Sequence, residues 1–154
     1  MLPRGEVMEI QEPGAYVEAP MTLFLMALVM AGTAELEVES KGHVFTSTEG
    51  VEVALAAVRS PGPRRALVRI TRVGASPASK VWLAQVHEGQ EISEYRVTVG
   101  KKNHLLLITR MGFPVVFLPE DGREVAISWN GEKSDALDTG ELLEEYRRQG
   151  KPKK

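Results

Sequence analysis

The chain has 154 residues, of which 43% are apolar and 26% charged, and its formal net charge is -2. Such a chain is long enough for one domain with a substantial core, and its composition excludes a mostly disordered protein. The small net charge excludes attraction to nucleic acid or to an anionic membrane by overall charge alone. Because there is no cysteine, disulfide bonds, thiolate metal sites and cysteine nucleophiles are excluded as well.

The first element in chain order is an uncharged apolar segment within residues 21–34. Its length suits the apolar region of a secretory signal, and it is shorter than a membrane-spanning helix requires. The small residues Gly32 and Ala34 occupy the positions that a signal peptidase would need for a cut before Glu35. We therefore expect residues 1–34 to be an N-terminal extension with an export signal in 21–34, which predicts a periplasmic or secreted protein.

The preceding residues, 1–20, oppose this prediction because they contain one arginine and four glutamates, the wrong sign for the leading region of a signal. The objection disappears if Met21 is the true initiator. Two alternatives stay open. The apolar segment could pack on the β core, or on a partner, in an intracellular accessory subunit. It could also remain as an uncleaved anchor, which would be the chain's one contact with a membrane.

From Glu35 onward, apolar and polar residues alternate, as is typical of half-buried strands. Tyr95, Val97 and Val99, for example, share one face of a run at residues 92–99. One later run is apolar on both faces, which predicts a central strand. The predicted strands are residues 35–39, 51–58, 66–73, 81–87, 92–99, 105–109, 113–118 and 124–129, the apolar run being 105–109.

Turn-forming residues separate these runs. The Pro-Gly segment 60–63 cannot continue a strand, and residues 100–103 and 120–122 are typical of hairpin loops. About eight short strands without intervening helical patterns predict an all-β fold. We expect residues 35–154 to form a single antiparallel β-sandwich domain, Ig-like, C2-like or barrel-like in its details.

One helix is predicted near the C-terminus, at residues 139–149. Asp138 is a good N-cap residue, and Glu141 stands three positions later, as in a capping box. Leu142, Leu143 and Tyr146 then form an apolar stripe on one side of the helix. We expect this helix to cover an end or an open face of the sheet.

Arginines form the largest charge cluster of the sequence, and no acidic residue interrupts residues 53–87. Strand parity places Arg69 and Arg72 on opposite faces, so the cluster does not share one surface. A site for a small anion or for an acidic partner is one interpretation. Solvated charges in a loop and at strand margins are the other. The cluster comprises Arg59, Arg64, Arg65, Arg69 and Arg72.

Other residue types give no catalytic constellation. The three histidines, His43, His87 and His104, lack the spacing of a metal site, and the methionines near residues 21–30 suit an apolar segment better than a copper site. Serine-nucleophile, phosphate-loop and zinc-protease motifs are absent from the sequence. We therefore expect no catalytic residue, no metal and no cofactor.

The sequence thus predicts a non-enzymatic, exported, bacterial-type module that binds a partner protein and no nucleic acid. A small β-barrel enzyme or ligand carrier with a cavity is a further alternative. Function in small β domains usually lies on loops that a rigid scaffold positions. Trp129 is included among the candidates because it ends its strand beside a turn, whereas Trp82 lies within an apolar run typical of a core. The candidate binding residues are Arg64, Arg65, Lys101, Lys102, His104 and Trp129.

Overall fold

The computed structural model describes residues 35–74, 80–110 and 112–150. The boundary between the two units of the chain falls between Glu35 and Leu36, and the fold below is that of the second unit. The export-signal prediction for 21–34, with its alternatives, lies outside the described residues. No helix within the described ranges is long and apolar enough to cross a membrane.

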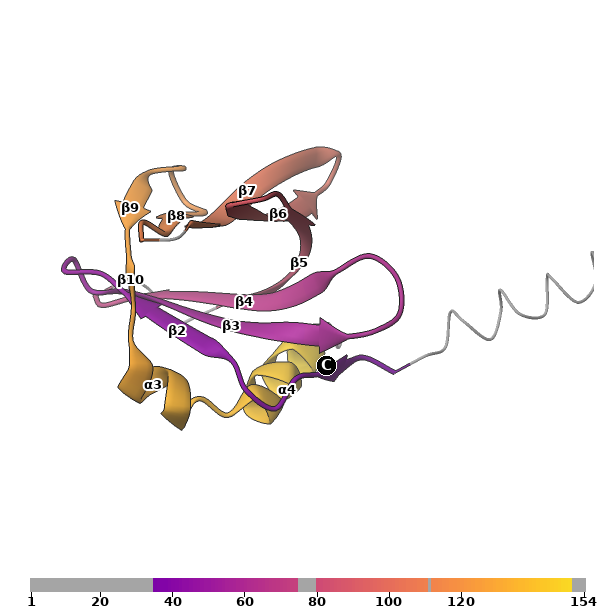
Figure 1. Ribbon diagram of the computed structural model, residues 1–154. Coiled ribbons are helices and arrows are strands. Elements are labelled where there is room, and N and C mark those ends of the chain that lie inside the picture. Colours follow the sequence, from indigo (N-terminus) through magenta and orange to yellow (C-terminus); the bar gives the residue numbers. More distant parts are fainter. Residues whose placement is uncertain (1–34, 75–79, 111, 151–154) are drawn as a thin grey trace, which may run out of the picture. The chain divides into compact units, whose positions relative to one another are not determined.

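The fold is mostly antiparallel β, arranged in one sheet that curls until it nearly closes. In Figure 1, β2, β3 and β4 form a layer that faces β6, β7 and β8, and β5 bends between the two layers. The hydrogen-bonded order is β10-β2-β3-β4-β5-β6-β7-β8-β9, and β1 pairs with β3. The strands are β1 (Glu37–Val38), β2 (His43–Thr46), β3 (Val51–Arg59), β4 (Arg65–Arg72), β5 (Lys80–Glu88), β6 (Ile92–Val99), β7 (Lys102–Arg110), β8 (Val115–Phe117), β9 (Glu124–Ala126) and β10 (Ser128–Trp129).

A single stretch of chain joins the two margins of the sheet. β9 pairs with β8 through Val116 and Val125, and β10 pairs with β2 through Phe45 and Trp129. Between these strands only Ile127 intervenes, and its side chain is buried. The chain thus pairs with β8 before Ile127 and with β2 after it. The edge of β2, which would otherwise be open, is largely paired as a result.

The core lies inside the curled sheet. Alternate residues of β3 and β4 point inward, including Val53, Leu55 and Val68, and all three are buried. They meet Leu107 of β7 and Val116 of β8 in one cluster of apolar side chains. Burial of this cluster is the main force that holds the two layers together.

Helix α4 (Thr139–Gln149) covers the outer face of the sheet, where it contacts β1, β4 and β5 and reaches Ala56 of β3. Leu142 and Leu143 are buried there against Ala56, Leu67 and Val81. The middle of the sheet is therefore covered on both faces, which explains the near-continuous apolar runs of these strands. In Figure 1 the shorter helix α3 (Gly131–Ala136) lies on the same side of the sheet as α4.

The predicted fold class, antiparallel β with one C-terminal helix, is confirmed, and α4 begins and ends where it was expected. The Asp138 side chain accepts a hydrogen bond from Glu141 N at 3.1 Å, as an N-cap residue should. Two strands were not foreseen as separate elements: β2 was missed, and 124–129 divides into β9 and β10. Residues 105–109 lie in the interior strand β7, between β6 and β8. Helix α3 was also missed.

Candidate binding site at the β3–β4 end of the sheet

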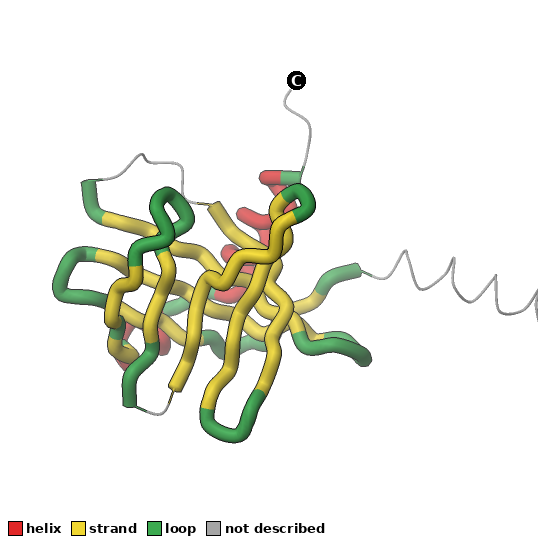
Figure 2. Tube along the Cα trace, turned by 90° about the horizontal axis from the view of Figure 1, so that it is seen from above, coloured by secondary structure: helices red, strands yellow, loops and turns green. Residues whose placement is uncertain are grey.

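A cleft of about 550 Å3 opens where the β3–β4 hairpin meets the start of β2, the end of β5 and Tyr95 of β6. Figure 2 shows that the loops lie at the ends of the strands, and the loop between β3 and β4 borders this cleft. The hairpin turn contains two prolines, which cannot donate to a ladder, and Gly62 between them has a φ of 115°. A side chain at Gly62 would be strained, so this position suits glycine. We call this opening the hairpin cleft; it is lined by Glu39, Lys41, His43, Leu55, Ala57, Val58, Arg59, Ser60, Arg64, Arg65, Ala66, Val86, Glu88 and Tyr95.

The floor of the hairpin cleft is apolar because it is the outermost layer of the core. Leu55 of β3 and Ala66 of β4 are buried, and Val86 and Tyr95 pack on the same core cluster while remaining partly exposed. Val86 and Tyr95 are directly opposite each other in the β5–β6 ladder. The floor is thus built from rigid strands, which favours binding without rearrangement.

Tyr95 is the polar group of this floor. Burial raises the pKa of its phenol, the hydrogen bond with the Thr109 side chain lowers it, and the Glu88 carboxylate raises it and the Arg64 guanidinium lowers it to lesser extents. The net direction is upward, so the phenol carries its proton at neutral pH. The floor therefore presents a neutral phenol, and it adds no negative charge to the cleft.

The rim of the hairpin cleft carries more positive than negative charge. Arg59 pairs with Glu39 at 3.2 Å, and Arg64 pairs with Glu88. Arg65 donates a 3.4 Å hydrogen bond to the neutral hydroxyl of Ser60. Both acidic residues of the rim are thus paired with arginines. Because the rim has four basic and two acidic side chains, two positive charges remain in excess. The basic residues are Lys41, Arg59, Arg64 and Arg65, and the acidic ones are Glu39 and Glu88.

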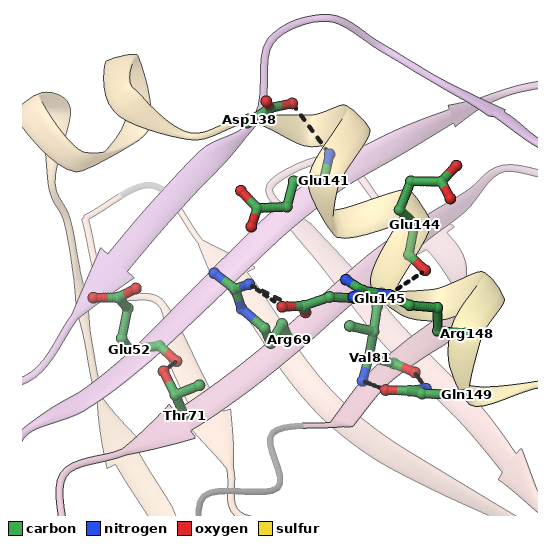
Figure 3. Close-up of polar contacts among 10 residues, drawn as sticks. All are labelled: Glu52, Arg69, Thr71, Val81, Asp138, Glu141, Glu144, Glu145, Arg148 and Gln149. Carbon is green, nitrogen blue, oxygen red and sulfur yellow. Dashed lines mark hydrogen bonds and ion pairs between the residues drawn. The ribbon is translucent and has the colours of Figure 1, made fainter. Parts of the chain in front are cut away.

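Two of the six predicted binding residues, Arg64 and Arg65, lie together at the hairpin cleft. Of the wider arginine cluster, Arg59 joins them there. Arg69 instead lies on the helix-covered face of the sheet, where its guanidinium contacts both carboxylate oxygens of Glu145 at 3.2 Å (Figure 3). The arginine cluster therefore does not share one surface, as the sequence predicted.

The other predicted residues lie elsewhere. Lys101 and Lys102 are exposed at the β6–β7 hairpin, at the far end of β6 from Glu88 and Tyr95. His104 lines a different pocket of about 380 Å3, beside Trp82 and Phe117. Trp129, 60% exposed, stands on β10 against Gly131. The six residues therefore form no single site.

Sequence reasoning missed three contributors to the hairpin cleft. Lys41 and His43 were overlooked because β2 was not recognised, although a β-branched and aromatic run, Val44 to Thr46, follows Gly42. Tyr95 was placed only on one face of the predicted strand 92–99, and no sequence signal brought it to a cleft, because its pairing with Val86 depends on strand register.

The described residues contain no group of three or more histidine, aspartate or glutamate side chains arranged to hold a metal ion. The hairpin cleft offers charge, an apolar floor and a phenol. These groups suit recognition of an anionic ligand that also has an apolar part.

No protein-family model, no curated protein and no solved structure matches this chain.

Proposed function

We propose that the chain is a non-enzymatic binding module that holds an acidic segment of a partner protein in the hairpin cleft. The observation that carries this proposal is the excess of two basic side chains around an apolar floor. An acidic side chain of the partner would approach Lys41 and Arg65, and a neighbouring apolar side chain would cover Leu55 and Val86. Electrostatic attraction then governs the rate and specificity of encounter, and apolar burial provides affinity.

The proposal includes export of the module to the periplasm or out of the cell. The apolar segment 21–34, with small residues before Glu35, supports this part. The alternative is an intracellular accessory subunit in which the same segment packs on the β domain or on a partner. The intact mass of the natively expressed protein distinguishes the two: a chain that begins at Glu35 supports export, and a full-length soluble chain contradicts it.

A peptide titration tests the binding proposal. The probe is a blocked peptide of alternating glutamate and leucine, measured by calorimetry against the wild type and Arg65→Ala. Loss of one basic rim group should weaken binding about fivefold, since an exposed charge pair is worth about 1 kcal/mol. Lys101→Ala, which removes an exposed positive charge at the β6–β7 hairpin, is the control and should leave affinity unchanged. Equal affinity of wild type and Arg65→Ala for the probe would contradict the proposal.

A second candidate is a carrier of a small carboxylate or phosphate compound with an apolar body. The cleft volume of about 550 Å3 favours it, since it lies within the range of small-molecule sites. Octanoate is the probe that separates the candidates. Saturable binding of octanoate that depends on Arg65, with no binding of the peptide, would favour the carrier.

A further inference from the structure

Strands β5 and β6 separate along half of their length. Their ladder joins Gln85–Glu88 to residues 93–96 and extends no further. The earlier part of β5, Lys80 to Gln85, pairs with β4 on its other side. The later part of β6, Val97–Val99, pairs with β7. A gap in the otherwise continuous sheet therefore opens between the two strands, and we call it the β5–β6 gap.

The backbone of β5 directs hydrogen-bonding groups into this gap. Val86 N–H donates to the carbonyl of Arg64, the residue immediately before β4. In an antiparallel ladder the even-numbered residues of β5 therefore bond toward β4. The odd-numbered residues Val81 and Leu83 consequently direct their N–H and C=O groups toward β6, where the ladder is missing. An extended edge of this kind can pair with another strand.

At Val81 a side chain takes the place of the missing strand. Val81 N–H donates to Gln149 Oε1 at 2.7 Å, and Gln149 Nε2 donates to Val81 O at 2.9 Å (Figure 3). The primary amide of Gln149 thus makes the donor and acceptor bonds that one peptide group of a paired strand would make. Gln149 is itself exposed, as the last residue of α4.

Recesses adjoin the gap. A groove of about 550 Å3 is bordered by Lys80–Leu83, by Val97–Gly100 and by the end of α4. A mainly apolar pocket of about 380 Å3 shares Trp82, Val97 and Val99 with this groove and extends to Leu118. Because successive side chains of a strand point to opposite faces, a strand in the gap would place alternate side chains in the two recesses.

We propose that the β5–β6 gap receives an extended segment of a partner protein, which displaces the Gln149 amide and pairs with Val81 and Leu83 as an added strand. The partner is a peptide because the edge offers alternating backbone donors and acceptors, and the amide already bound there is the chemical equivalent of a peptide group. Alternate apolar side chains of the segment occupy the pocket beside Trp82. This surface is separate from the hairpin cleft, so either proposal can fail without the other.

The test uses the full-length protein and a neutral, blocked heptapeptide in which serine or threonine alternates with valine. Its lack of charge removes attraction to the hairpin cleft. Gln149→Ala eliminates the competing amide, so we expect it to bind the peptide about fivefold more tightly than the wild type. Arg148→Ala, a neighbouring exposed residue of α4, is the matched control and should bind as the wild type does. Nuclear magnetic resonance should show the largest amide shifts at Val81 and Leu83.

Two further peptides complete the design, one N-methylated at the odd-numbered residues and the other at the even-numbered residues. Only one of these two sets of N–H groups can point toward β5. One of them should lose binding, because N-methylation removes the donors that reach β5. The proposal is overturned if both methylated peptides bind as well as the parent, or if Gln149→Ala leaves affinity unchanged. It is also overturned if no binding is measured at millimolar peptide with either protein. Gln149→Glu retains an acceptor for Val81 N–H and should give weaker peptide binding than Gln149→Ala.

Discussion

In two regions of this sheet a helix side chain completes a strand ladder, and the two differ in burial. On β2, the chain leaves the ladder at Asn130, whose N–H donates to Val44 O at 2.8 Å. The carbonyl of Asn130 then accepts from Ser134 N inside α3, so the Ser134 hydroxyl accepts from Val44 N instead, at 2.8 Å. On β5, the amide of Gln149 in α4 serves Val81 in the same way.

The two helix side chains differ in how far they are buried and in what holds them in place. Ser134 is 8% exposed and also donates to Asn130 O at 2.6 Å, so its position is fixed by its own helix and by β2. Gln149 is exposed at the end of α4. Its helix is held by other contacts, among them buried Leu142 and the Arg69–Glu145 pair, whose side chains are 21% and 27% exposed. We infer that the β2 region contributes to stability, whereas Gln149 can leave Val81 without loss of the fold.

The largest loss of stability is expected from Gly42→Ala, a change in the residue immediately before β2. A Cβ atom there would lie 2.5 Å from Leu55 O and 2.7 Å from Leu137 Cδ2, beneath the segment that joins α3 to α4. The backbone oxygen cannot move without distorting β3, so we expect a loss of about 3 kcal/mol in the free energy of unfolding. Urea denaturation measures it. Gly89→Ala, whose Cβ would be 3.4 Å from its nearest neighbour, is the control, and equal losses in the two variants would contradict the account.

The next largest loss of stability is expected from Ser134→Ala. Removing the hydroxyl leaves the buried N–H of Val44 without its acceptor, which costs about 2 kcal/mol. Hydrogen exchange at Val44 should accelerate together with the global loss of stability. Asp135→Ala, an exposed change in the same helix, should have little effect. A Ser134→Ala protein as stable as the wild type would show that the two regions do not differ as we infer.

Asp138→Ala loosens the N-terminus of α4 and should cost about 1 kcal/mol, the usual value of an N-cap side chain. The bond lost is that from Glu141 N to the Asp138 side chain, at 3.1 Å. Asp138→Asn keeps an acceptor and should restore most of the stability. Failure of asparagine to restore it would indicate that the carboxylate charge, and not the hydrogen bond, matters at this position.

The sequence was sufficient where local chemistry determines structure. The Asp138 cap and the stripe of Leu142 and Leu143 located α4, and alternation located most strands, because both signals depend on neighbours in sequence. β2 has only four residues, too few for a clear period, and α3 is a six-residue helix with one buried residue, Ser134. Both owe their stability to contacts distant in sequence, which composition does not reveal.

The candidate sites show the same limit. The Pro-Gly turn marked the loop that carries Arg64 and Arg65, but the approach of Lys41, Glu88 and Tyr95 to that loop depends on the curling of the sheet. The β5–β6 gap could not be predicted from the sequence either. Strand pairing is decided by register and curvature, which no run of residues specifies alone.

The smallest effect on stability is expected from Gln149→Ala, and it sharpens the comparison most. Val81 itself is buried, but Gln149 is exposed, so removing its side chain lets water reach the Val81 N–H and C=O groups, and the loss should be about 0.5 kcal/mol. Hydrogen exchange should accelerate at Val81 while Val44 keeps its protection, the reverse of the pattern in Ser134→Ala. If exchange accelerates across β2 and β5 together, Gln149 supports the fold as a whole. The edge of β5 would then be part of what stabilises the fold, and a partner strand could not pair with it.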